Sequence, residues 1–131
     1  MNKLLAGITL LVAVIFMLMG LRWLVDPSGA AEGLGMPLLE GLARSTQIGD
    51  LASFFVGGSV MTLMGLKTKQ ASWFQAAALL LGLTAVFRTF TWLFHDAPFA
   101  AELIAAEVVF CTILLLAASH LTTGHKNKVL D

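Results

Sequence analysis

The sequence predicts an all-α integral membrane protein, an antiparallel bundle of four transmembrane helices that forms a single domain over residues 1–131. Apolar residues make up 58% of the chain and charged residues only 12%, far from the usage of soluble proteins. Four hydrophobic segments are each long enough to cross the roughly 30 Å of bilayer hydrocarbon as a helix. The chain has room for these spans and short connections, and for no separate soluble domain.

The four expected helices cover residues 4–25, 46–66, 71–94 and 99–121. The first follows Lys3 as a secretory signal would, but its apolar core is too long for a signal peptide, so we interpret it as a retained helix. The connection 26–45 contains prolines and glycines that argue against a continuing helix. We expect an ordered loop there, or a segment whose apolar stretch GMPLLEGL lies along the membrane surface.

Lysines occur on one side of the four predicted crossings. They are Lys3 before the first helix, Lys67 and Lys69 in the second connection, and Lys126 and Lys128 in the tail. Positively charged segments stay in the cytoplasm, so we expect both termini there. In a bacterium the chain would be a multi-pass protein of the inner membrane, with its other two connections facing the periplasm.

Three charged residues fall inside predicted helices, all in the outer half of the membrane. At about 1.5 Å of rise per residue, Asp50, Arg88 and Glu107 lie roughly 6, 9 and 12 Å from the outer helix ends. A lone arginine in hydrocarbon is costly, so we expect the planar guanidinium of Arg88 to hold both carboxylates in a buried cluster. Either Arg22 joins this cluster and balances its charge, or Glu107 carries a proton.

Polar residues recur at helical spacing around these charges. They do so from Thr84 to His95 on the third helix and from Gln47 to Gly57 on the second. The predicted ligand-binding or buried charge cluster therefore comprises Asp50, Arg88, Glu107, Arg22, Gln47, Thr84, Thr91, Trp92 and His95. The simpler alternative is that these charges only fix how the helices pack.

Small residues predict where the helices approach one another. The second helix carries small residues at multiples of four: Gly49, Ser53, Gly57 and Gly65. The first carries them at intervals of seven: Ala6, Ala13 and Gly20.

Trp23, Trp73 and Trp92 lie near helix ends and are typical of interfacial anchors. The single cysteine, Cys111, is interpreted as a packing residue.

Several classes of function are disfavoured by the sequence. Eight basic and eight acidic residues give no net positive charge that would attract nucleic acid. The spacing of His120 and His125 in a polar tail does not predict a metal site, and no cofactor is expected. P-loop, Rossmann, zinc-protease and Ser/His/Asp patterns do not occur, which favours a non-enzymatic protein.

Four short motifs carry a resemblance that covers nearly the whole chain. They are LRWLVDP, STQIGDLASFFVGG, TAVFRTF and AAEVVF. With them the chain resembles a group of small, uncharacterised bacterial four-helix membrane proteins, and it shares its general layout more distantly with DoxX-like and sterol-isomerase-like proteins. The resemblance implies the four-helix architecture and the group Asp50, Arg88 and Glu107, and it implies no activity.

Three functions remain open at this point. The first is a non-enzymatic membrane module or accessory subunit, with a membrane protein partner or weak self-association. The second is a binder or carrier of a small lipophilic or anionic ligand, supported by the polar pocket in the outer half. The third is an intramembrane isomerase-type enzyme that uses Glu107 or Asp50 as acid and base around Arg88. The lack of a catalytic motif ranks them in this order.

Overall fold

The computed structural model describes the backbone of residues 1–129 and the side chains as far as residue 122. It contains α1 (Lys3–Val25), α2 (Pro27–Gly33), α3 (Gly41–Thr68), α4 (Ala71–Phe94) and α5 (Ala101–Val129). His125 and the lysines at 126 and 128, used in the sequence analysis, lie outside the described side chains.

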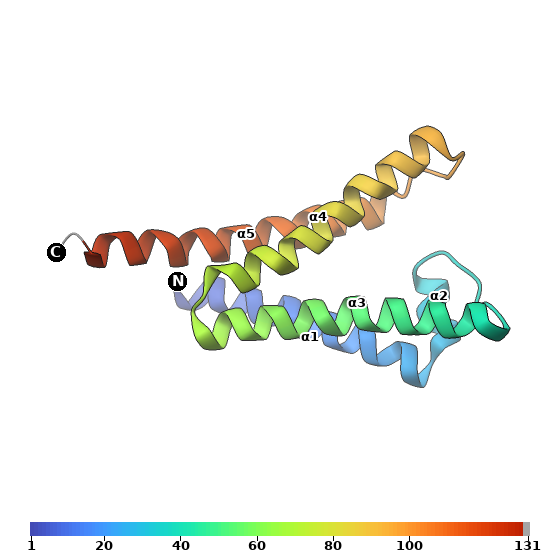
Figure 1. The fold of residues 1–131 in the computed structure, drawn as a ribbon, viewed down its shortest axis with the longest axis horizontal. Coiled ribbons are helices and arrows are strands. Elements are labelled where there is room, and N and C mark those ends of the chain that lie inside the picture. Colours follow the sequence, from blue (N-terminus) through green and yellow to red (C-terminus); the bar gives the residue numbers. More distant parts are fainter. Residues whose placement is uncertain (130–131) are drawn as a thin grey trace.

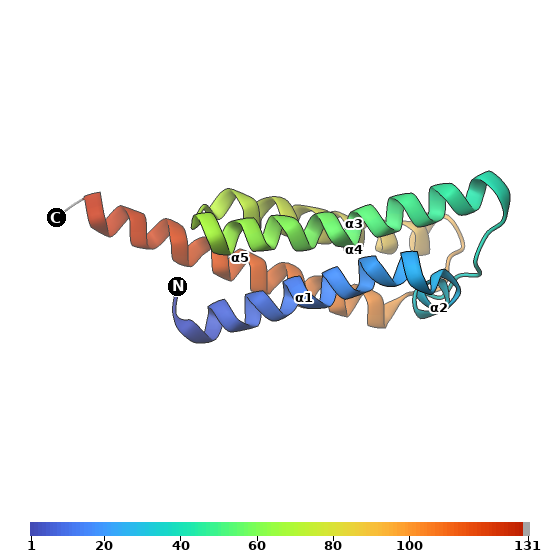
Figure 2. The same cartoon turned by 90° about the horizontal axis from the view of Figure 1, so that it is seen from below.

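The long helices form two antiparallel hairpins. In the first hairpin α1 packs mainly against α3, and in the second α4 packs mainly against α5. The N-terminus and the C-terminal end of α5 lie at the same end of the molecule as the tight α3–α4 connection, which we call the turn end (Figure 1). The segments 34–40 and 95–100 lie at the opposite end, the loop end, towards which α4 diverges from α3 (Figures 1 and 2).

Four helical segments are long and apolar enough to cross a membrane. They are α1, α3, α4 and the part of α5 from Ala101 to Thr122. The described chain is therefore an all-α, multi-pass membrane protein with four spans, and this prediction is confirmed.

The connection between the first two spans differs from the expectation. Residues 27–33 form the short helix α2, and α3 already begins at Gly41 rather than at residue 46. Pro27 occupies the first turn of α2, where its missing N–H needs no partner. The Asp26 carboxylate accepts a hydrogen bond from the Gly29 N–H at 3.0 Å and caps the helix. The proline therefore starts a helix here rather than preventing one.

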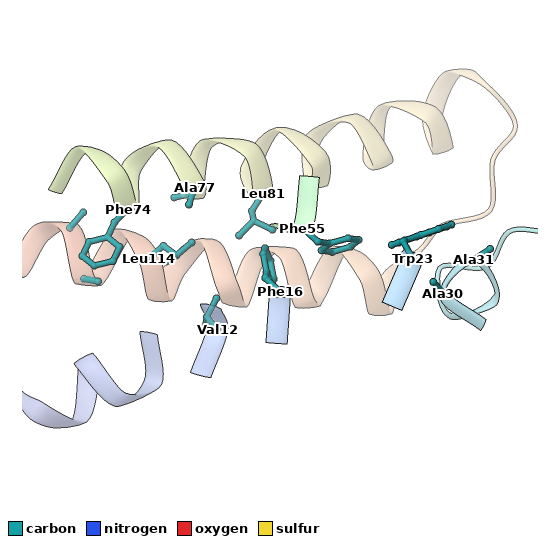
Figure 3. Packing of buried hydrophobic residues seen from close by; sticks show 13 residues of the cluster. Val12, Phe16, Trp23, Ala30, Ala31, Phe55, Phe74, Ala77, Leu81 and Leu114 are labelled. Atoms are coloured by element: carbon teal, nitrogen blue, oxygen red, sulfur yellow. The ribbon is translucent and has the colours of Figure 1, made fainter. Parts of the chain in front are cut away.

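The turn end is closely packed. Phe74 of α4 is fully buried, and a Cβ placed on Gly65 of α3 would lie 2.6 Å from its ring. Leu114 of α5 is also fully buried, beside Ala77 and Phe74 (Figure 3). Lys69 ends α3 in the left-handed region, with a φ of 57°, and its N–H is bonded to the carbonyl of Gly65. Small residues thus let α3, α4 and α5 meet here.

The first hairpin is held by small residues and one buried hydroxyl. Ser59 donates a hydrogen bond to the carbonyl of Ala13 at 2.7 Å. A Cβ on Gly20 would lie 2.6 Å from a methyl group of Val56 and 3.0 Å from its backbone nitrogen. The predicted contacts at Ala13 and Gly20 of α1 are therefore confirmed.

The small-residue face predicted for α3 is confirmed only at Gly65, which packs against Phe74. Gly49 and Gly57 have no neighbour within 4 Å of an added Cβ, and Ser53 is exposed. A spacing of four residues drifts by about 40° per step, so a stripe from residue 49 to 65 turns through about 160° and leaves one face. The buried residues of α3 are Gln47, Phe55, Gly58, Ser59, Thr62 and Gly65.

Trp23 is also placed differently from the expectation. Its side chain is only 1% exposed and lies beside Ala30 and Ala31 of α2, not at a lipid interface (Figure 3). Together these residues close the loop end of α1 with an apolar contact.

Candidate functional site

A cavity of about 340 Å³ lies between the two hairpins. Its walls come from the loop-end halves of all four long helices and from residues 34 and 36 of the connection. Four polar or charged side chains line it: Asp50, Thr84, Arg88 and Glu107. The structure thus brings four of the nine predicted site residues to one cavity.

Aromatic rings make up much of the apolar wall. Phe16 meets Phe55 and Phe110 edge to face, with ring centroids 5.7 and 5.4 Å apart, and Phe54 lies against Phe55 at 5.2 Å. These phenylalanines are not among the predicted site residues. Helical spacing could have found two of them, because Phe54 is four residues from Asp50 and Phe110 is three residues from Glu107.

Arg88 and Glu107 form an ion pair across the second hairpin. The Arg88 Nε donates to the Glu107 Oε1 at 2.7 Å. The side chains are 30% and 12% exposed, respectively. The second carboxylate oxygen, Oε2 of Glu107, is buried and has no hydrogen-bond partner within the described part of the chain. A buried acceptor left in this state is costly, so a donor that reached it from the cavity would be stabilised.

Asp50 faces the same cavity from the first hairpin. Among the described side chains, no hydrogen bond or ion pair joins it to Arg88. The expectation that Arg88 holds both carboxylates is therefore wrong: it pairs within its own hairpin, and the cavity separates it from α3. The expectation of a buried charge cluster is also wrong, since Asp50 is exposed and the side chains of Arg88 and Glu107 are partly exposed.

Arg22 does not join this group. It pairs instead with Asp26, one helical turn later, with 3.3 Å between Nη2 and Oδ2. The hydrogen bond from the Gly29 N–H, followed by that from Arg22, lowers the pKa of Asp26 below its ordinary value. Arg22 therefore belongs to the junction of α1 and α2. Without it, the charges of Asp50, Arg88 and Glu107 sum to −1.

Gln47 has a structural role in the long connection. Its side chain accepts a hydrogen bond from the Leu39 N–H at 2.9 Å and donates one to the Pro37 carbonyl at 3.0 Å. The buried amide therefore ties residues 37–39 to the first turns of α3, away from the cavity.

Two predicted residues of α4, and His95 directly after it, lie outside the cavity. The Thr91 hydroxyl donates to the carbonyl of Arg88, the Trp92 ring lies 4.9 Å from that of Phe99, and the His95 ring lies 5.6 Å from that of Phe90. All three predicted residues are exposed. Because α4 diverges from α3 towards the loop end, a polar stripe that continues past Arg88 no longer faces the other hairpin (Figure 1).

Cys111 packs between the helices of the second hairpin, where its Sγ donates to the carbonyl of Ala78 at 3.3 Å. Within the described residues, no group of three or more His, Cys, Asp and Glu side chains is placed to hold a metal ion. The groups available for chemistry at the cavity are thus one guanidinium, two carboxylates and one hydroxyl.

Comparison with models of known protein families, with curated proteins and with solved structures finds no match to this chain. The function of the cavity must therefore be inferred from its own size, walls and charges. Its volume exceeds what ordinary helix packing leaves, because packed protein interiors contain few voids larger than a water molecule.

Proposed function

We propose that this membrane protein binds a small amphiphilic molecule in the cavity between its hairpins. The observation that carries the proposal is one cavity of about 340 Å³ with mostly apolar walls and a polar group on one side. This volume lies within the range of small-molecule sites, roughly 300 to 1,000 Å³, and such sites combine apolar walls with few polar groups. The aromatic wall would hold the apolar part of the ligand.

The polar part of the ligand has partners in the same cavity. Arg88 uses only its Nε in a hydrogen bond among the described residues, so its two terminal nitrogens remain available as donors. Oε2 of Glu107 and the carboxylate of Asp50 remain available as acceptors. A bound head group would thereby satisfy atoms that the protein leaves without a partner.

The test is purification with native lipid, followed by mass spectrometry of every molecule that accompanies the protein. Ala106→Trp fills the cavity from α5, whereas Ala105→Trp adds the same bulk at an exposed neighbour that does not line it. We expect a stoichiometric small molecule with the parent chain and with Ala105→Trp, and its loss with Ala106→Trp. Equal amounts in both variants, or no such molecule with the parent, would contradict the proposal. A stoichiometric protein partner instead would favour an accessory subunit.

We also propose that the chain lies in a bacterial inner membrane with both termini in the cytoplasm, as a relative of the small four-helix proteins it resembles. The lysines at positions 3, 67 and 69 support this orientation, which assigns the cavity to the periplasmic half. In a Cys111→Ala background, an impermeant thiol reagent added outside should label a cysteine at Ser28 and not one at Thr68. The reverse pattern would invert the topology.

A further inference from the structure

We infer that the molecule bound in the cavity is a lipophilic cation, with an ammonium head group on a small apolar body. The inference rests on the proposed binding function and specifies the class of its ligand. Three features of the cavity support it: an unpaired carboxylate, an arginine whose charge is balanced by an ion pair, and an aromatic wall.

The unpaired carboxylate is that of Asp50. It lies nine residues after the start of α3, about 14 Å along the helix by its rise, and lines the cavity from the first hairpin. Among the described residues it has neither a hydrogen bond nor an ion pair with a basic side chain. An ionised carboxylate with apolar surroundings is strongly stabilised by a nearby positive charge.

The charge of Arg88 is already balanced within the second hairpin. Its Nε lies 2.7 Å from Glu107, so the pair contributes no net charge to the cavity. An anionic head group would have to compete with Glu107 for Arg88 while facing Asp50. A cationic head group meets the excess charge of −1 and can approach the buried Oε2 of Glu107 as well. The sequence left a lipophilic or an anionic ligand open. This charge balance disfavours an anion and favours a lipophilic ligand that carries a positive charge.

The aromatic wall favours the same ligand. Phe16, Phe54, Phe55 and Phe110 line the cavity. The faces of aromatic rings attract cations, and ammonium groups without N–H donors are commonly bound by several rings together. Four phenylalanines and one carboxylate can therefore hold a quaternary ammonium group without a direct hydrogen bond.

The test compares three probes with the same eight-carbon chain: octyltrimethylammonium, octanol and octanoate. Each is titrated calorimetrically into the protein in nanodiscs of zwitterionic phospholipid, with empty nanodiscs to subtract partitioning into lipid. We expect saturable binding of octyltrimethylammonium that is about tenfold or more tighter than that of octanoate, because each tenfold step reflects one modest ionic contact. Asp50→Asn should remove most of this preference.

The control variant is Glu102→Gln, which makes the same change of charge on α5 outside the cavity and should leave the preference intact. Binding of octanol or octanoate as tight as that of the cation would overturn the inference while supporting the proposed binding function. An unchanged preference in Asp50→Asn would also overturn it, since the selectivity would then arise elsewhere. If none of the three probes binds saturably, both the inference and the proposed function fail.

Discussion

The two ends of this bundle are built from the same four helices but pack in different ways. At the turn end, the ring of Phe74 packs against Gly65, and small residues of α4 and α5 are buried beside it. At the loop end, the positions between the hairpins hold phenylalanine, leucine, methionine and three charged side chains around a cavity of about 340 Å³. The turn end joins the hairpins, and the loop end holds them apart.

This difference shows that residue size and charge determine the shape of the bundle along its axis. The helices within the first hairpin remain close beyond the middle of the bundle, because Gly20 of α1 accepts Val56 of α3. The opening therefore lies between hairpins rather than within one. In a membrane, helices associate through close packing and polar contacts rather than through the hydrophobic effect. A region where large and charged residues outnumber small ones between the hairpins can consequently stay open.

The largest expected effect comes from truncating the ring that closes the turn end. Phe74→Ala should lower the free energy of unfolding by about 3–5 kcal/mol, because a fully buried phenylalanine leaves a cavity among rigid neighbours. Phe54→Ala removes the same atoms at the loop end, where the ring is half-buried and already borders a cavity, and should cost about 1 kcal/mol. Reversible unfolding in mixed micelles measures both. Equal losses would show that the two ends are packed alike.

The second effect concerns the ion pair of the loop end. Arg88→Leu leaves Glu107 without its partner, and we expect a loss of about 2–3 kcal/mol, below that of a fully buried pair because Arg88 is 30% exposed. Arg88→Met combined with Glu107→Gln removes both charges and should recover most of the loss.

Asp50→Asn provides the comparison for this cycle. Asp50 makes no described contact with Arg88, so its substitution should add to that of Arg88 without coupling. Coupling as strong as that between Arg88 and Glu107 would mean that the three charges act as one cluster after all.

The sequence predicted the four spans and the group of charged residues better than it predicted their partners. Hydropathy identifies helices long enough to span because each must satisfy its own backbone in lipid. It contains no information about the angle between hairpins, so Asp50 was assigned to Arg88 although it lies across the cavity. Gln47 and Arg22 were assigned to the site because they are polar and close to the expected depth of the charges. In the structure they bind the nearby residues Leu39 and Asp26 and not the charged group.

A smaller effect tests whether the first hairpin is closed at the level of the cavity. Gly20→Ala places a methyl group against the backbone and side chain of Val56 and should cost about 1–3 kcal/mol through overpacking. Gly7→Ala, where no atom lies within 4 Å, should be stabilising by about 0.5–1 kcal/mol because alanine favours the helix. The same unfolding assay measures both, and a neutral Gly20→Ala would mean that α1 and α3 can separate at little cost.

The smallest effect is local to the loop end and depends on pH. The Gly29 N–H and Arg22 lower the pKa of Asp26 below its ordinary value of 3.8, so the charged cap contributes fully above that pH. As the pH falls through the lowered pKa, the carboxylate is protonated and the contribution is lost. The amide resonance of Gly29 should titrate with a midpoint below 3.8. Arg22→Gln should raise this midpoint, and a midpoint unaffected by Arg22 would exclude its role.

The position of Arg88 and Glu107 in one hairpin has a consequence for biogenesis. Only 19 residues separate them along the chain, and α4 and α5 are consecutive transmembrane helices. As the second hairpin leaves the translocation machinery, the two charges can meet and enter the bilayer as a neutral pair, without waiting for α1 and α3. An isolated arginine would face an insertion cost of about 2.5–3.5 kcal/mol at the membrane centre. The order of synthesis thus allows α4 to be inserted together with the helix that neutralises it.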